Sequence, residues 1–360
     1  MVRTLSLLAS LCLLSACGGR ADSVPPEAPA DTARVVALPT SQLPEDAEGP
    51  LVVYTGRSEG LAAPLIQRFR ERTGLEVEVR YADDAALLAM LAAEGDRSPA
   101  DVLWGNSAGA MGTAAARNLL TVLPDSMRVL PGQFVPISGR WLPLTVRFRV
   151  LAYAPDRVDK AALPTSIIGL PDVAALNGRL GWTPAYSSFQ DFLTAVRLEG
   201  NDGVAADWLD AMMASGAKAY ASNEQMLDAL ATGAIDAALI NHHHVLLANE
   251  DGADLAFHTF AAGDPGNLGT VTGAGVLDTS ARQRAARQFV SFLLSAEAQT
   301  FAAENTKEIP VVAGAEVPSG YLTFEAAAEL APRLDVERFG DFDGTLALLR
   351  TKGLLPEAAR

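Results

Sequence analysis

The hydrophobic positions along the chain change their spacing repeatedly, and these changes predict alternating strands and helices from Leu51 onward. Residues 51–54 form a short apolar run typical of a buried strand. Apolar residues then recur at helical spacing until Gly74, which marks a helix end. These residues are Leu61, Leu65, Ile66 and Phe69. Because strands separated by helices form mostly parallel sheets, the pattern predicts an α/β fold.

The same alternation continues along the chain. Val77 and Val79 alternate as a second strand, residues 84–94 predict a helix that Gly95 closes, and residues 101–104 predict a third strand. Much later, the segment Ser222-Asn223-Glu224-Gln225 matches a capping box. The helix that it opens is expected to end at Gly233, and residues 234–240 then read as another buried strand.

Three consecutive histidines, His242 to His244, follow that strand directly after Asn241. In open α/β sheets, ligands bind beyond the carboxyl ends of the strands. Imidazole is a common metal ligand, so the position and the residue type together indicate a metal-binding site. At this point the alternative is a solvated loop that happens to contain three histidines.

The N-terminus predicts export. Residues 1–17 have one positive charge at Arg3 and an apolar run too short to span a bilayer, as in a signal peptide. The residues Leu14-Ser15-Ala16-Cys17 resemble a bacterial lipobox, which implies cleavage before Cys17 and lipidation of its thiol. An ordinary signal peptide with an incidental cysteine is the alternative. Residues 18–50, rich in proline and alanine and poor in apolar side chains, predict a disordered tether.

Composition excludes several classes of function. The chain has 28 Lys and Arg against 43 Asp and Glu, a formal net charge of −15, which disfavours nucleic acid and adhesion to anionic lipid. Cys12 and Cys17, the two cysteines of the sequence, lie in the signal segment, so thiolate sites in the folded domain are excluded. We find no His-Glu-x-x-His motif, no nucleophile elbow and no phosphate loop, so the chain is not expected to be an enzyme.

An ordered set of short segments, from about Leu51 to the C-terminus, resembles the ferric-iron substrate-binding proteins of bacterial ABC transporters. The segments are residues 51–59, 97–102, 139–141, 147–151, 181–184, 188–190, 241–242, 263–266 and 292–299. The resemblance implies a type II periplasmic-binding-protein fold, an α/β architecture of two lobes with a ligand cleft between them. Residues 51–146 and 278–360 would form lobe 1 with the C-terminal helices. Residues 147–277 would form lobe 2 with the crossover strands, Arg147–Tyr153 and a return at Val271–Leu277.

The resemblance also implies roles for individual residues. The family has a pair of tyrosine iron ligands at the positions of His243 and His244, so these two histidines are candidate metal ligands. Asn241 and Asn223 match asparagines that hold an accompanying anion, and the helix start at Ser187 and Ser188 would add backbone amides. Arg147 and Arg149 match a basic pair that contacts the anion in some members. The guanidinium fork suits carbonate or phosphate, although a plain salt bridge is the alternative for an arginine on a strand.

Departures from the family pattern affect the metal. Imidazoles suit Zn²⁺, Cu²⁺, Ni²⁺ and Fe²⁺ better than the hard ion Fe³⁺. At the first strand-to-helix turn, where many members place a ligand, this chain has Arg57-Ser58-Glu59. Glu59 is a candidate metal ligand there and Ser58 a candidate anion ligand. Tyr186 is a further candidate metal ligand, with lining of the cleft as its alternative role, and Asn106 replaces an acidic ligand of some members.

These observations predict an exported lipoprotein that captures iron with an anion such as carbonate or phosphate and delivers it to an ABC permease. The alternative is the same fold adapted to zinc, another divalent metal or a small organic anion. We expect a monomer that faces the periplasm or the extracellular side, held to the membrane only by its N-terminal lipid and binding no nucleic acid.

Overall fold

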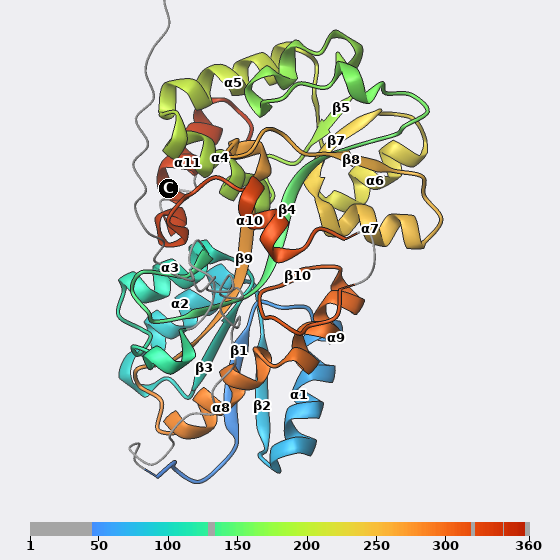
Figure 1. Cartoon of the computed structure of the whole chain (residues 1–360). Coiled ribbons are helices and arrows are strands. Elements are labelled where there is room, and N and C mark those ends of the chain that lie inside the picture. Colours follow the sequence, from blue (N-terminus) through green and yellow to red (C-terminus); the bar gives the residue numbers. More distant parts are fainter. Residues whose placement is uncertain (1–44, 129–133, 318–320, 341, 357–360) are drawn as a thin grey trace, which may run out of the picture. The chain divides into compact units, whose positions relative to one another are not determined.

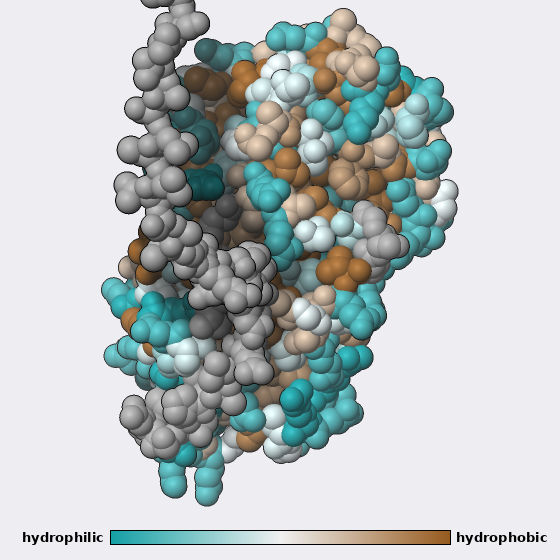
Figure 2. Space-filling view, viewed as in Figure 1, coloured by the Kyte–Doolittle hydropathy of each residue, from teal (hydrophilic) through white to brown (hydrophobic). Residues whose placement is uncertain are grey.

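The computed structural model describes residues 45–128, 134–317, 321–340 and 342–356. The predicted signal peptide, Cys17 and most of the predicted tether lie outside these ranges. Among the described residues, no helix is both long and apolar enough to cross a membrane. Polar and apolar residues are interspersed over the face shown in Figure 2.

Ten strands of the described chain form one sheet, in which eight follow the order β2-β1-β3-β9-β4-β7-β5-β6 (Figure 1). The strands are β1 (Leu51–Thr55), β2 (Val77–Tyr81), β3 (Val102–Gly105), β4 (Leu142–Tyr153), β5 (Leu180–Trp182), β6 (Lys218–Ala219), β7 (Ala237–Asn241), β8 (Ala256–His258), β9 (Gly269–Val276) and β10 (Ile309–Pro310). β8 and β10 pair with β4 beside this path.

Helices pack against both halves of the sheet. They are α1 (Glu59–Thr73), α2 (Asp84–Glu94), α3 (Ala108–Ala116), α4 (Ser187–Glu199), α5 (Asp202–Ala214), α6 (Asn223–Ala231), α7 (His242–Glu250), α8 (Gln283–Leu293), α9 (Ala296–Thr306), α10 (Phe324–Leu330) and α11 (Phe342–Thr351). α1, α2, α3 and α8 contact the strands around β1, β3 and β9, whereas α6 and α7 contact β7 and β4.

The long strand β4 connects the two halves of the sheet. Residues 142–148 of β4 pair antiparallel with β9, and residues 149–153 pair antiparallel with β7 and β8. On either side of this junction, β1 runs parallel to β2 and β3, and β5 runs parallel to β6 and β7. Close packing fixes the β4–β9 contact, because a Cβ added to Gly273 would lie 2.5 Å from the ring of the buried Trp141.

Several local predictions are confirmed at the level of individual caps. Gly74 adopts a left-handed conformation with φ of 73° and closes α1, and its N–H donates to the carbonyl of Arg70. The hydroxyl of Ser222 accepts from the backbone N–H of Gln225, and the Gln225 side chain accepts in return from the N–H of Ala221. The Ser222 half of the predicted capping box is thus formed at the start of α6, while Gln225 reaches one residue further back than the N-cap.

Two boundaries differ from the sequence-based division. Asp46, placed in the predicted tether, accepts from the backbone N–H groups of Arg284 and Ala285 at the start of α8, so ordered structure extends N-terminal to Leu51. At the other end of the chain, α11 packs against α4, and Thr345 hydrogen-bonds Thr194 at 2.6 Å. The last helix therefore contacts the segment predicted as lobe 2, although the prediction grouped residues 278–360 with lobe 1.

Candidate functional site

The three consecutive histidines form the first turn of α7, directly after β7 ends at Asn241. His242 is fully buried, and its Nδ1 accepts the backbone N–H of Phe148 at 3.0 Å. The rings of His243 and His244 lie side by side with centroids 4.1 Å apart. Nδ1 of His243 is buried without a hydrogen-bond partner, so it is available to a ligand.

Burial keeps this histidine cluster neutral. It lowers the pKa of His242 and of His244 to about 4, and that of His243 well below the ordinary value. The charge of Arg147 acts in the same direction on His243 and His244. Because a metal binds only the neutral imidazole, protons do not compete with a metal for these rings at neutral pH.

Arg149 gathers the residues predicted to hold an anion. Its guanidinium lies 2.9 Å from the carbonyl oxygen of Leu239 and 3.4 Å from both the Ser188 hydroxyl and the Asn241 side-chain oxygen. Asn223 joins the same group through a 2.9 Å contact between its Nδ2 and Nε2 of His244. Burial lowers the pKa of Arg149 to about 9, and the charge of Asp191 opposes this shift.

These contacts bring three helix N-termini together. Ser188 belongs to the first turn of α4, Asn223 begins α6, and Asn241 immediately precedes α7. The N-terminus of a helix has unpaired N–H groups and about half a positive charge, so each favours an anion. The side-chain oxygen of Asn223 is buried and unpartnered, which leaves a further polar atom for a ligand.

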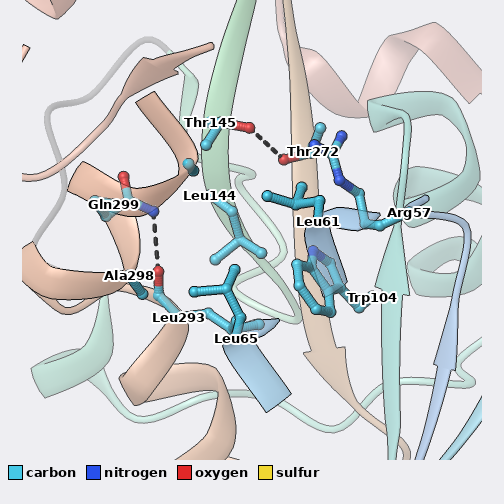
Figure 3. Close-up of a pocket in the computed structure, with 11 residues that line it drawn as sticks. Arg57, Leu61, Leu65, Trp104, Leu144, Thr145, Thr272, Leu293, Ala298 and Gln299 are labelled. Carbon is cyan, nitrogen blue, oxygen red and sulfur yellow. Dashed lines mark hydrogen bonds between the residues drawn. The ribbon is translucent and has the colours of Figure 1, made fainter. Parts of the chain in front are cut away.

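A second group of charges lies where β4 meets the turn after β1. Arg57 donates to the Asn106 side-chain oxygen at 2.8 Å and to both carboxylate oxygens of Glu308 at 2.9 Å. Arg147 donates to the backbone carbonyl of Asn106. Burial alone would raise the pKa of Glu308, but the charges of Arg57 and Arg147 hold it below its ordinary value. Figure 3 shows Arg57 beside the hydrogen-bonded pair Thr145 and Thr272.

A pocket of about 620 Å³ opens beside this second group. Its lining comes from α2, α3, the start of α4 and α11, and includes Asp84, Leu88, Asn106, Ser187 and Leu346. The carboxylate of Asp84 accepts from the backbone N–H of Asn106 and the hydroxyl of Ser107. Asn106 therefore lies on the pocket wall and is also bonded to both arginines.

Comparison with known proteins identifies the family. Residues 51–305 match the model of the bacterial extracellular solute-binding proteins. The chain belongs to this family. It is 32% identical over 314 residues to the major ferric iron-binding protein of Neisseria meningitidis serogroup B, covering 84% of this chain and 93% of that protein. It is 28% identical to the Fe(3+)-binding periplasmic protein of Serratia marcescens, covering 69% of this chain and 75% of that protein.

Solved structures agree. Iron-bound HitA from Pseudomonas aeruginosa is similar with a TM-score of 0.76 and 32% identity, covering 84% of this chain and 99% of that one. A Trichodesmium protein in complex with iron and citrate ligands has a TM-score of 0.74 at 21% identity, covering 85% of this chain and 99% of that one. The predicted type II periplasmic-binding-protein fold is confirmed, and so is the expectation that the chain is a binding protein and not an enzyme.

The other predicted site residues of this solute-binding protein lie further apart. Ser58 and Glu59 are exposed at the start of α1, and the Glu59 charge helps burial to raise the pKa of Tyr81. Ser187 is exposed, and the half-buried Tyr186 immediately precedes α4. Tyr186 is close enough to Arg147 to oppose the lowering of the Arg147 pKa by burial. No three His, Cys, Asp or Glu side chains of the described residues are grouped to hold a metal, so Glu59 does not join the two histidines.

Four charged residues of the site were not selected from the sequence. They are Arg57, Asp84, Asp191 and Glu308. Asp191 had a usable signal, because it shares the buried face of α4 with Ser188, Phe192 and Ala195. A carboxylate on such a face is unusual and indicates a functional or paired group. Glu308 had none, since it is 251 residues away from Arg57 in the chain.

Proposed function

We propose that this chain is the substrate-binding component of a bacterial ABC importer and captures ferric iron, together with an accompanying anion, for delivery to a membrane permease. Two relatives are named as ferric iron-binding proteins, which supports this proposal. The structural observation that favours capture of a metal together with an anion is the pair of neutral, adjacent imidazoles of His243 and His244 beside the group around Arg149. Iron as that metal rests on the names of the relatives.

In this proposal the metal is held by His243 and His244, with Tyr186 as a further ligand. The accompanying anion rests on Arg149, Asn223 and Asn241 and on the amides at the start of α4. Arg147 would contribute a further positive charge toward this anion. The unpartnered atoms of His243 and Asn223 fit such a ligand, because a buried polar atom without a partner is costly unless a ligand satisfies it.

We propose that the ligand cleft lies between the lobe of residues 51–146 with 278–360 and the lobe of residues 147–277. Closure around the ligand would follow the hinge motion by which two-lobed binding proteins exclude water. The unbroken strand β4 contributes to both halves of the sheet, which suits a connection that bends without breaking pairing.

One observation favours a second candidate, namely zinc or another divalent metal as the cargo. Two imidazoles stand where the resemblance places two phenolates, and imidazole is the softer ligand. A small organic anion without metal would use the same arginines.

Elemental analysis of the native, untagged protein purified without chelators tests the cargo. We expect iron in a stoichiometric amount, because the relatives are named as ferric iron-binding proteins and because neutral histidines do not lose a metal to protons at the pH of purification. Stoichiometric zinc with no iron would favour the second candidate. Absence of any metal, with the protein folded, would favour the organic anion.

The attachment to the membrane is part of the proposal and rests on Cys17, which follows the apolar segment of the signal. Replacing Cys17 with Ala is expected to abolish lipidation, because the thiol is the acceptor of the lipid. The variant should lose its partition with membranes, since the described residues offer no membrane-spanning helix. Membrane fractionation and the mass of the mature N-terminus measure this. Unchanged processing and partition in the variant would contradict it.

A further inference from the structure

A small cavity of about 20 Å³ lies beside Arg57 in the interior of the protein. All of its lining residues are buried, and they come from the turn after β1, from β3, β4 and β9, and from α1, α8 and α9. Figure 3 shows Arg57, Trp104 and Thr272 on one side of the cavity, across from Gln299. Because one water molecule needs roughly 10–15 Å³, the size suits a single water and is too small for an organic ligand.

Two hydrogen-bond donors of the cavity wall have no partner. The indole N–H of Trp104 and the Nε–H of Arg57 are both buried, and neither meets an acceptor among the described residues. The other nitrogens of Arg57 are engaged, Nη1 with Asn106 and Nη2 with Glu308. Indole and guanidinium groups donate but cannot accept, so these two N–H groups cannot satisfy each other. Since a buried unpaired donor is costly, the pair favours an acceptor from outside the chain.

Thr272 supplies an acceptor at the same cavity. The hydroxyl of Thr145 donates to the carboxylate of Glu308, so toward Thr272, 2.8 Å away, it can only accept. The proton of the Thr272 hydroxyl therefore points to Thr145, and the lone pairs of Thr272 Oγ1 are left for another donor. Two donors and one acceptor match a water molecule, which makes about three hydrogen bonds when buried. A halide ion could accept from the two N–H groups but has no proton for Thr272.

An unpartnered indole alone does not define such a site. Nε1 of Trp141 and Nε1 of Trp182 are also buried without a partner in the described part of the chain. Trp104 differs because three further features coincide there, namely a cavity of the right size, the second donor of Arg57 and the acceptor of Thr272. It is this coincidence that indicates a ligand.

We propose that the cavity is a binding site for one structural water molecule, which accepts from Trp104 Nε1 and Arg57 Nε and donates to Thr272 Oγ1. The water completes the hydrogen bonding of Arg57. It fastens the turn after β1 and the strand β3 to β9 and, through the bond between Thr272 and Thr145, to β4. These are the two strands predicted to cross between the lobes. The inference does not depend on the cargo, so its failure would leave the proposed function untouched.

A high-resolution crystal structure of the full chain tests the site directly. We expect one isolated peak of electron density within about 2.7–3.2 Å of the three named atoms. A second crystal soaked in sodium bromide identifies the occupant, because bromide has an anomalous signal and water has none. A bromide peak in the cavity would assign the site to a halide and overturn the proposal. A well-ordered cavity wall with no density inside would overturn it as well.

Nuclear magnetic resonance of protein labelled with ¹⁵N in tryptophan tests the site in solution. We expect a nuclear Overhauser effect between the Trp104 indole proton and water, with the sign given by a long-lived bound molecule. The Trp104→Phe variant assigns the indole signal. Trp208 is the internal control without such an effect, because its Nε1 donates to the carbonyl of Ile167 at 2.9 Å. No effect at Trp104 would contradict a bound water.

A substitution of Thr272 tests the acceptor. Thr272→Val keeps the shape of the side chain and leaves no buried donor unpaired, since the Thr145 hydroxyl still donates to Glu308. We expect the water peak to be lost or much reduced in crystals of this variant. Thr270→Val is the matched control on the same strand, where the lost hydroxyl donates to the carbonyl of Arg147, and the peak should remain. An unchanged peak in Thr272→Val would overturn the hydrogen-bond assignment on which the proposal rests.

Discussion

The double substitution His243→Ala/His244→Ala is expected to abolish useful metal capture. Structural zinc sites gain roughly 10–16 kcal/mol from four ligands, or about 3 kcal/mol for each, so loss of two should weaken binding by more than about a thousandfold. Removing two largely buried rings leaves a cavity and breaks the contact between Nε2 of His244 and Nδ2 of Asn223, so the variant is compared only after its folding is verified. Competition against a chelator of known affinity, with iron supplied as ferric citrate, measures the change.

Two single substitutions serve as controls. His242→Ala leaves the buried Phe148 N–H without its acceptor and a cavity where the ring was, so it should lower stability by about 2 kcal/mol or more while largely preserving affinity. His258→Ala removes a histidine whose Nε2 contacts the carbonyl of Pro164, away from α7, and should leave affinity unchanged. If the double variant binds iron like wild type, the histidine pair is not the metal site and the anion group around Arg149 becomes the whole site.

Local sequence patterns were sufficient for the elements that position the histidines. The capping box at Ser222, the helix end at Gly74 and the apolar run before Asn241 each depend on neighbours a few residues apart. Such short-range rules placed the histidines at a strand end correctly. They did not predict that α7 begins at His242, because three histidines followed by apolar residues have no strong capping signal.

Long-range charge pairing is the part that the sequence could not supply. Arg57 received no role from the sequence, although it stands in the turn where many family members place a metal ligand. In the fold it is buried against Glu308 and Asn106. The pKa values of the histidines could not be predicted from the sequence either. A free imidazole has a pKa of about 6.5, which would make metal binding sensitive to mild acid. Burial lowers the pKa of His244 to about 4, and burial is known only from the structure.

The resemblance to a family predicted more of the anion site than pattern alone did. Arg149, Ser188, Asn223 and Asn241 come from four separate segments, and the structure brings them together. Asp191 was not among the residues that the resemblance singled out, yet the charges of Arg147 and Arg149 both act on it. One oxygen of its carboxylate is buried without a hydrogen-bond partner, so the group is poorly compensated.

Replacing Asp191 with Asn is expected to make the stability of the protein less dependent on pH. Burial raises the pKa of Asp191 from an ordinary value of 3.8 to about 7, with Arg147 and Arg149 opposing the shift and Asp84 adding to it. Between these two values the folded state keeps a proton that the unfolded state releases. The aspartate therefore costs more stability as pH rises through this window, and the cost is constant above it. Asparagine has the same shape and no such cost.

The stability gain of Asp191→Asn over wild type should thus grow between about pH 4 and pH 7, by up to about 1.4 kcal/mol per pH unit, and level off above. Urea unfolding of both proteins across this range measures it. The other titratable groups of the site, including the three histidines of α7, are common to both proteins and largely cancel in the difference. Asp207→Asn, an exposed change on α5, is the control and should show no such trend. A gain that stays constant or shrinks as pH rises would mean that Asp191 is ionised in the folded protein and paired with Arg149, and the positive charge of the site would then be smaller by one.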